Sequence, residues 1–401
     1  MRRPQPRRSL SSQGGPISLR GDEERAAVLA AAWGAAGEGA DDLTHGFHTY
    51  PARMPPGLAR ALIAAFSRPG DRVLDPFCGS GTVLVEAMLA GRHATGVDAS
   101  PLALRIAEAH CALRTAAQRA AFERSLQHVT EASLGRVRER VKARAPLSAR
   151  QRAHYGPHVL LELAGLLEEL RRVQPESDRR ALEVVFSSLL VKFSNKLADT
   201  SEAPAEKRIR KGLVSEFFLR KGQELSRRWE ALAAAAPADA RAPSLVCGDS
   251  RALPRLLSAK RFELVLSSPP YGGTYDYHSH HDLRYAWLGL DASAAERAEI
   301  GARRRLSAGG STAAGARRWD AELDASLRAM AAVCAEGAWV VLVLGDAEVA
   351  GTPVDALLQL ERLAPAAGLT VIASAAEPRR DYRGGPQRSE HIVLLRNRSR
   401  A

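Results

Sequence analysis

The stretch from Phe262 to Tyr271, FELVLSSPPY, predicts a buried strand that ends in a rigid turn. Its first half is apolar, which is typical of a strand inside a sheet. Pro269 and Pro270 have no N–H to donate, so the strand cannot continue through them. The turn presents the Ser268 hydroxyl, backbone carbonyls and the Tyr271 ring, a set suited to holding a flat ring that carries an amine. A loop that happens to contain two prolines is the alternative that this stretch alone leaves open.

The composition describes a globular protein with a basic surface. The 401 residues are 45% hydrophobic and 25% charged, enough for one large or two ordinary domains. A net charge of +12 favours a polyanionic partner, although a GC-rich genome also produces arginine-rich chains. No apolar run is long enough to span a membrane and no signal segment is visible, so we expect a cytoplasmic protein. The four scattered cysteines predict reduced thiols.

A strand, a glycine turn and a helix lie far upstream of this stretch. The residues before Asp75 predict a strand, and the run from Asp75 to Thr82, DPFCGSGT, leads from it into a helix. Gly79 and Gly81 let the backbone approach a ligand, and the helix N-terminus offers free N–H groups. The next strand ends at Asp98, where an acidic residue can hold ribose hydroxyls. A plain turn with Asp98 as a helix cap is the alternative, but the combination indicates the nucleoside-binding half of a doubly wound α/β sheet.

The chain divides into four regions by charge and apolar periodicity. Residues 1–40 predict a basic disordered tail, over about the first 20 residues, and then a short helix. Residues 41–111 contain the nucleoside-binding half. Residues 112–243 show helical periodicity with many arginines and no strand-like run, which indicates a helical insertion. Residues 244–401 return to strands and close with two apolar runs that predict an antiparallel hairpin.

Two polar and basic stretches are candidates for contacts with phosphates or bases. One begins with KFSNK at 192–196, and the other is the Gly-, Ser- and Arg-rich segment 301–318, which predicts a flexible flap over a cleft. A solvated basic face and a plain surface loop are the alternatives. No metal is expected, because His278, His280 and His281 lack the spacing of metal ligands. The candidate nucleic-acid-binding residues are Lys192, Ser194, Asn195, Lys207, Arg208, Arg303 and Arg304.

The paired motifs resemble those of the DNA amino-methyltransferases, which use S-adenosylmethionine to methylate exocyclic amines. DPFCGSGT after one strand, an acid ending the next and SPPY after a later one carry the resemblance. HTYPARMPP, just before the glycine motif, is similar to the segment that precedes it in many of these proteins. The resemblance covers residues 44–111 and 244–397. It implies the α/β fold of Rossmann-like class I methyltransferases, with a mostly parallel doubly wound sheet and an antiparallel C-terminal hairpin, plus the helical insertion.

The resemblance also implies roles for residues of this chain. Residues 41–111 would form the cofactor-binding part, 244–401 the catalytic part and 112–243 a possible DNA-recognition region. Asp98 would hold the ribose of the cofactor and Asp249 would lie by its adenine. The target base would be held by Ser268, Pro269, Pro270 and Tyr271. The S-adenosylmethionine site would comprise His48, Tyr50, Pro51, Asp75, Phe77, Gly79, Gly81, Thr82, Asp98 and Asp249.

The implied reaction is methyl transfer to the exocyclic amine of a base that has been flipped out of DNA. Serine at the start of the SPPY motif is associated with N4 of cytosine more often than with N6 of adenine. The alternatives are adenine N6 methylation in DNA, methylation of a guanine or adenine amine in RNA, and a catalytically inactive DNA-binding protein of the same fold. The implied partners are DNA in the nucleoid and, in a restriction-modification pair, a cognate restriction endonuclease encoded elsewhere.

Overall fold

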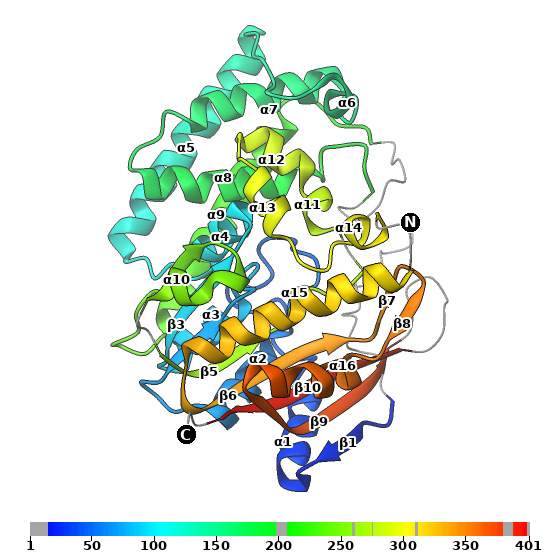
Figure 1. Cartoon of the computed structure of the whole chain (residues 1–401). Coiled ribbons are helices and arrows are strands. Elements are labelled where there is room, and N and C mark those ends of the chain that lie inside the picture. Colours follow the sequence, from blue (N-terminus) through cyan, green and yellow to red (C-terminus); the bar gives the residue numbers. More distant parts are fainter. Residues whose placement is uncertain are drawn as a thin grey trace.

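An eight-stranded sheet with helices on both faces organises the computed structural model, which describes residues 15–197, 207–258, 261–274, 276–308, 312–379 and 388–398 (Figure 1). The strand order is β1-β9-β10-β6-β5-β2-β3-β4. The five strands from β6 to β4 run parallel, whereas β10 is antiparallel to both of its neighbours. The strands are β1 (Ser18–Gly21), β2 (Arg72–Asp75), β3 (His93–Asp98), β4 (Ser244–Cys247), β5 (Phe262–Ser267), β6 (Cys334–Gly345), β9 (Leu369–Arg379) and β10 (Arg388–Asn397).

The α/β class, the mostly parallel doubly wound sheet and the antiparallel pair at its C-terminal end are confirmed. The predicted turn between β9 and β10, at 384–386, lies outside the described residues. A separate two-stranded sheet joins β7 (Ala347–Val349) to β8 (Thr352–Val354).

Two apolar layers hold the helices on the sheet. On one face, Leu29, Leu62 and Val85 belong to the core under α1, α2 and α3. On the other face, Leu327 and Leu360 belong to the core under α10, α15 and α16. The bounds of these helices are α1 (Glu23–Gly34), α2 (Pro56–Phe66), α3 (Thr82–Leu89), α10 (Leu253–Leu257), α15 (Thr312–Val333) and α16 (Ala356–Leu363).

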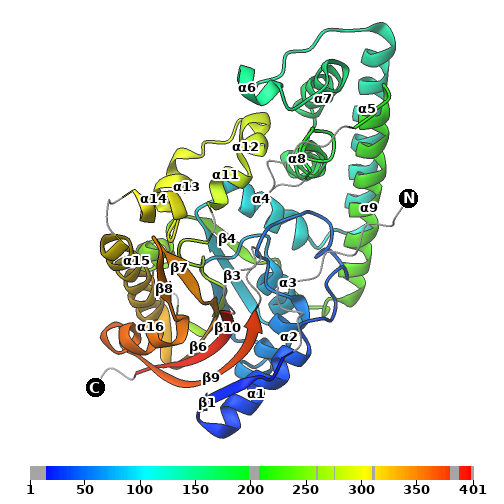
Figure 2. The ribbon, with the colours of Figure 1, turned by 90° about the vertical axis from the view of Figure 1, so that its right-hand side faces the viewer.

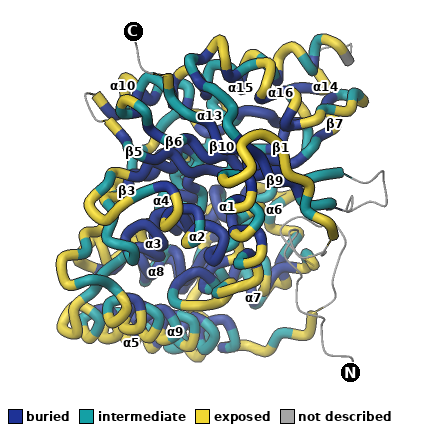
Figure 3. The backbone as a smooth tube through the Cα atoms, turned by 90° about the horizontal axis from the view of Figure 1, so that it is seen from below, coloured by how far each residue is buried: buried dark blue, intermediate teal, exposed yellow. Residues whose placement is uncertain are grey.

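The insertion is helical, as predicted, but it shares its core with the rest of the protein. One hydrophobic cluster joins Phe186 and Trp229 of the insertion to Ile106 of α4 and Trp287 of α12. Figure 2 shows α5 and α9 side by side at the edge of the molecule, and Figure 3 shows their exposed outer faces. The helices of this part are α4 (Pro101–His110), α5 (Ala116–Glu139), α6 (Ala149–Arg152), α7 (Pro157–Leu170), α8 (Glu176–Leu190), α9 (Leu213–Ala235) and α12 (Asp282–Leu288).

The prediction of a disordered tail is wrong for the last residues of that segment. β1 pairs antiparallel with β9, with Leu19 opposite Ala375. Gly21 has φ +84°, and a Cβ there would lie 2.2 Å from the Ile372 carbonyl oxygen, so only glycine fits. All four residues of β1 are exposed, so this edge strand lacks the apolar alternation by which strands are recognised. Residues 1–14 lie outside the described part of the chain.

The predicted flap at 301–318 is also wrong over the residues that the structure describes. α14 (Arg303–Ser307) and the start of α15 occupy most of it, after the short helices α11 (Tyr277–His280) and α13 (Ser293–Ala298). Leu306 and Trp319 are buried against the sheet side of these helices. Two apolar anchors therefore order a segment whose Gly and Ser content suggested a loop.

Within the described residues, none of the helices combines the length and apolarity of a membrane span.

Candidate active site

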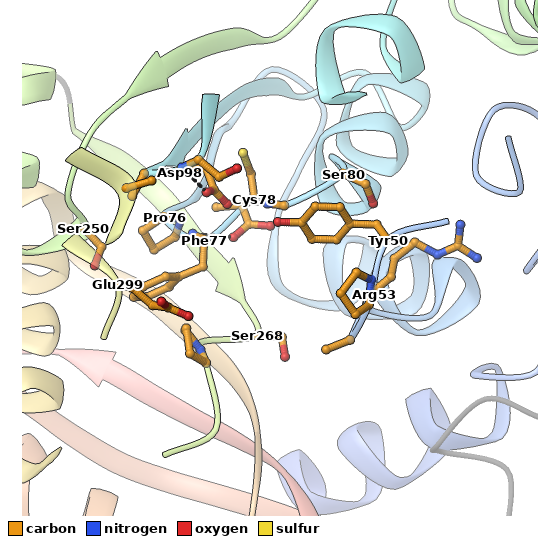
Figure 4. Close-up of a pocket in the computed structure, with 18 of the residues that line it drawn as sticks. Tyr50, Arg53, Pro76, Phe77, Cys78, Ser80, Asp98, Ser250, Ser268 and Glu299 are labelled. Atoms are coloured by element: carbon orange, nitrogen blue, oxygen red, sulfur yellow. Dashed lines mark hydrogen bonds between the residues drawn. The ribbon is translucent and has the colours of Figure 1, made fainter. Parts of the chain in front are cut away.

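A cavity lies at the carboxyl edge of β2, β3 and β5, where the ends of parallel strands converge. Its volume, measured out to its open mouth, is about 1030 Å³. Figure 4 shows Ser268, from the turn after β5, facing the same space as Tyr50, Phe77 and Asp98. The two motifs that are far apart in the sequence therefore form one site. Of the predicted residues, those that line it are Tyr50, Pro51, Asp75, Phe77, Gly79, Thr82, Asp98, Ser268 and Pro270.

Asp98 is fixed by the glycine turn beside it. The Gly79 N–H donates to Oδ2 and the Ser100 N–H donates to Oδ1, each at 2.8 Å. Burial raises the pKa of Asp98, and these two N–H groups act in the opposite direction. Gly79 has φ +49°, and a Cβ there would lie 3.0 Å from Cε1 of Tyr50. The carboxylate is thus held rigidly in the cavity wall, with lone pairs left on both oxygens for the hydroxyls of a ribose.

Two buried hydroxyl groups show that the cavity fits a ligand with a polar end. Ser80 and Thr82 both line it, and their side-chain oxygens have no hydrogen-bond partner within the described part of the chain. Buried hydroxyls are nearly always hydrogen-bonded, so a ligand is expected to supply the partners. The amino acid portion of S-adenosylmethionine carries a carboxylate and an ammonium group that suit them. The residues present therefore fit the cofactor that the motifs imply.

Asp75 connects the two motifs directly. Its Oδ1 accepts hydrogen bonds from the Ser267 hydroxyl at 2.6 Å and from the Phe77 N–H at 3.1 Å. Burial raises the pKa of Asp75 to about 7; the charge of Asp98 adds to this, while the two hydrogen bonds oppose it. Because Ser267 immediately precedes Ser268, this contact ties the end of β2 to the turn after β5.

With the methionine part of S-adenosylmethionine against Asp75, as the resemblance implies, we expect the affinity for this cofactor to fall as the pH drops below about 7, because protonation of Asp75 would remove a negative charge from beside its ammonium group. Above this pKa the carboxylate is ionised and binding is tight. Asp75→Asn should bind weakly, with little change from about pH 6 to 8. Calorimetric titration across that range checks this. A wild-type affinity that does not change with pH would place Asp75 away from the ammonium group.

Two residues assigned to the cofactor site lie behind the wall of the cavity. His48 is buried, with its Nε2 2.7 Å from the Ser187 hydroxyl of α8, and burial followed by the charge of Arg284 lowers its pKa. Gly81 has φ +86°, and a Cβ there would lie 3.0 Å from that of Ala107. Both residues therefore shape the site through packing, because neither lines it.

The predicted position of Asp249 beside the adenine needs correction. Its carboxylate accepts hydrogen bonds from the guanidinium of Arg251, the shortest at 2.6 Å, and from the Arg251 N–H. The residues on either side of it, Gly248 and Ser250, line the cavity instead. Asp249 thus pairs with Arg251, and the neighbouring residues form this end of the wall.

The turn after β5 places its aromatic ring differently from the prediction. Ser268 and Pro270 line the cavity, whereas Pro269 and Tyr271 do not. The Tyr271 ring is buried, and its hydroxyl donates a hydrogen bond to Glu390 of β10. Burial and the charge of Glu390 raise the pKa of Tyr271, and a hydrogen bond from Ser268 opposes them. Tyr271 therefore anchors the turn, and the expected stacking surface for a base is not formed by its ring.

A cover over the cleft was predicted for the segment after the SPPY turn, but the helices that form this roof were not. The roof is formed by the segment that follows the SPPY turn, including α12 and α13, and Tyr285 fixes it through a 2.7 Å hydrogen bond between its hydroxyl and that of Ser100. The aromatic and His residues at helical spacing after residue 277 were the available signal. The roof residues that line the cavity are His281, Tyr285, Ala295, Ala298, Glu299 and Ile300.

Two of the predicted nucleic-acid-binding residues donate hydrogen bonds to backbone carbonyls of the protein itself. Ser194 is buried, and its hydroxyl donates to the Val191 carbonyl. The Lys207 ammonium donates to four carbonyl oxygens at the C-terminal end of α8, those of Val191, Lys192, Ser194 and Lys196, at 2.6 to 3.1 Å. Helix ends leave carbonyls that need donors, and these side chains supply them. The prediction is wrong for the buried Ser194, whereas Lys207 is exposed and its contact with nucleic acid stays a prediction.

The other five predicted nucleic-acid residues are exposed. The ammonium of Lys192 lies 4.3 Å from the centre of the Phe217 ring. Asn195 hydrogen bonds His154 at 3.1 Å. The guanidinium groups of Arg303 and Arg304 lie 3.8 and 3.7 Å from the Asp276 carboxylate. Both arginine side chains are still exposed, by 50% and 63%. Their contact with nucleic acid, and that of Arg208, stays a prediction.

Asp346, Asp355 and His391 bring three potential metal-ligating atoms together. Asp346 Oδ1 already accepts from the Ala356 N–H and lies 2.9 Å from His391 Nε2. Asp355 caps the N-terminus of α16. The cluster therefore reads as a structural hydrogen-bond network that joins β6, β10 and α16.

Comparison with known proteins adds a family match over the first quarter of the chain. Residues 15–109 match the family model N6_N4_Mtase, described as DNA methylase. The chain is 41% identical over 64 residues to the type II methyltransferase M.MjaII of Methanocaldococcus jannaschii, which is 16% of this chain and 12% of the relative. It is 48% identical over 50 residues to a tRNA (guanine(10)-N2)-dimethyltransferase of Methanothermobacter thermautotrophicus, 12% of this chain and 15% of the relative.

The chain thus spans less than a fifth of the length of these two relatives. Among solved structures, the rRNA methyltransferase aviRa of Streptomyces viridochromogenes aligns over 90% of this chain and 94% of its own, at 16% identity and a TM-score of 0.36. A TM-score this low is too weak to support an argument.

Proposed function

We propose that this protein transfers a methyl group from S-adenosylmethionine to the exocyclic amine of a base in DNA, since residues 15–109 match the DNA methylase family model of N6 and N4 amino-methyltransferases. One observation carries the proposal: the glycine turn with Asp98 and the SPPY turn with Ser268 line the same cavity. A nucleoside-binding wall and an amine-binding turn in one space are what this reaction requires.

The cofactor would lie against the floor of the cavity. Asp98 would hold its ribose hydroxyls, and Ser80 and Thr82 would hold its amino acid portion. When bound, S-adenosylmethionine supplies an electrophilic methyl group on a sulfonium.

The chain's own contribution to the chemistry begins at Ser268. An amine conjugated to a base ring is a poor nucleophile, because its lone pair is delocalised. The Tyr271 hydroxyl donates to Glu390, so the hydrogen bond between the Ser268 and Tyr271 hydroxyls uses the Ser268 proton. The lone pairs of Ser268 are then left to accept an N–H of the amine. This favours a tetrahedral nitrogen as positive charge develops.

The charge of the insertion supports a nucleic acid as the substrate. The insertion, residues 112–243, contains 25 Lys and Arg residues against 16 Asp and Glu, a surplus of nine out of the net +12 of the chain. Basic surfaces bind phosphates through counterion release, whatever the base sequence. A duplex base must leave the stack to enter the cavity, and a DNA-bound insertion would hold the duplex while it does so.

Within this proposal we favour N4 of cytosine, because the turn begins with Ser268, and adenine N6 is the alternative base. The type II methyltransferase relative and the DNA methylase match support DNA as the substrate, and a cognate restriction endonuclease stays part of the proposal. The tRNA methyltransferase relative supports a second candidate, methylation of a guanine amine in RNA, through the same turn.

The proposal is tested by incubating the protein with methyl-labelled S-adenosylmethionine and either duplex DNA or tRNA, followed by digestion to nucleosides. We expect the label in N4-methyl-2′-deoxycytidine from DNA. Label in N6-methyl-2′-deoxyadenosine would change the base, and label confined to tRNA guanine would support the second candidate. No label in either polymer would contradict a nucleic-acid methyltransferase.

A further inference from the structure

His281 is a buried imidazole in the wall of the active-site cavity. Only 2% of its surface is exposed, and it lies at the start of α12 in the roof. Its ring stacks on that of Tyr50, with centroids 5.1 Å apart and planes 28° apart. Tyr50 comes from the segment before the glycine turn, so the stacked pair connects that side of the cavity to the roof. The ring orientation of His281 is therefore fixed.

The position of Arg284 determines which nitrogen of His281 carries the proton. Nη1 of Arg284 lies 3.3 Å from Nδ1 of His281. A guanidinium has only donors, so Nδ1 must act as the acceptor and cannot carry a hydrogen. A doubly protonated ring would set an N–H against a guanidinium N–H. His281 is thus neutral, with its hydrogen on Nε2, which makes Nε2 a donor.

The helical insertion holds Arg284 in place. The side chain is 2% exposed, and its Nε donates to the Ser187 carbonyl of α8 at 3.3 Å. The Ser187 hydroxyl also contacts His48. α12 packs against α8, as Figure 2 shows. The tautomer of His281 is therefore set by a buried network to which the insertion, the roof and the segment before the glycine turn each contribute.

An imidazole donor and a serine acceptor in one cavity match a particular ligand edge. A base with an exocyclic amine presents an N–H donor beside a ring acceptor, N3 in cytosine and N1 in adenine. Ser268 suits the donor and His281 suits the acceptor. The floor residues Ser80, Thr82 and Asp98 already suit the cofactor, whereas His281 comes from the segment that continues the SPPY turn.

We propose that His281 is a base-binding residue, whose Nε2–H donates to the ring acceptor next to the amine to be methylated, and that Arg284 is the positioning residue that keeps the hydrogen on this nitrogen. The inference rests on the proposed function and assigns the roof a part in reading the base. Arg284 and His281 are both buried, and the methyl transfer step itself uses neither of them. The inference assigns them one shared role.

The test compares His281→Phe, which keeps a flat ring for Tyr50, with His281→Gln, which keeps a side-chain N–H. We expect His281→Phe to lower kcat/KM for the nucleic acid by about 10- to 100-fold, and His281→Gln to recover most of it, because one hydrogen bond to the base is lost and restored. The dissociation constant of S-adenosylmethionine should stay within about twofold in both variants. Nitrogen-15 NMR of wild-type His281 should show the Nε2–H tautomer, and Arg284→Met should change it.

The outcomes separate this inference from the proposed function. If wild-type protein methylates no nucleic acid, the proposed function fails and the inference falls with it. If the wild type is active and His281→Phe matches it, the proposed function stands and the inference is wrong. An equal loss of cofactor affinity in His281→Phe would also overturn it, because the donor would then serve the cofactor.

Discussion

Replacing Ser268 with Ala is expected to slow methyl transfer by about 100-fold without changing the affinity for S-adenosylmethionine. In the proposed reaction, the Ser268 hydroxyl is the side-chain acceptor that the SPPY turn offers to the amine. It lines the cavity, and the proposal gives it no contact with the cofactor. The interaction strengthens as the nitrogen becomes tetrahedral, so its loss should appear in kcat. Single-turnover kinetics with saturating cofactor measure this rate.

Tyr271→Phe is the matched control for this variant. It keeps the buried ring and removes only the hydroxyl that links Ser268 to Glu390. We expect a loss of about tenfold in kcat, since Ser268 remains but no longer has the Tyr271 hydroxyl to accept its proton and orient it. Tyr271→Phe as inactive as Ser268→Ala would indicate that the tyrosine hydroxyl itself contacts the substrate.

Asp98→Asn is expected to weaken S-adenosylmethionine binding by about 100-fold or more, because the negative charge and one of the two acceptor oxygens that would hold the ribose hydroxyls are lost. Both oxygens of Asp98 receive backbone N–H groups, at 2.8 Å each. The amide nitrogen of Asn would face one of these donors, so the Gly79 turn would also shift. Calorimetric titration gives the affinity, and a melting curve shows whether the fold is retained.

Asp249→Asn is the control that the structure offers for this prediction. Its carboxylate pairs with Arg251 and does not line the cavity, so we expect the cofactor affinity to stay within about threefold of wild type. A large loss in Asp249→Asn with little loss in Asp98→Asn would restore the role for Asp249 that its place at a strand end suggested.

The parts of the site that were predictable from sequence are those set by local backbone chemistry. The prolines after β5 and the glycines after β2 each require a particular turn, and a turn fixes where its neighbours point. Asp98 is the last residue of β3, so its place at the carboxyl edge of the sheet also follows from the local sequence. These short-range constraints gave most of the floor of the cavity.

The roof and the fates of single polar side chains were not predictable, because they depend on long-range contacts. Arg284 is buried against α8 of the insertion, where its Nε donates to the Ser187 carbonyl. Lys207 caps α8 because the chain returns there, and Asp249 turns to Arg251. β1 has no apolar pattern, so only the open edge of β9 explains it.

The most direct test of the account is nucleoside mass spectrometry of DNA and tRNA from host cells that express either the wild-type protein or Ser268→Ala. We expect N4-methyl-2′-deoxycytidine in the DNA of cells with wild-type protein and its near absence with the variant. A methylated nucleoside that is raised above the level of cells without the protein, and raised equally by wild type and Ser268→Ala, would contradict the claim that the cavity between the glycine turn and the SPPY turn is the active site.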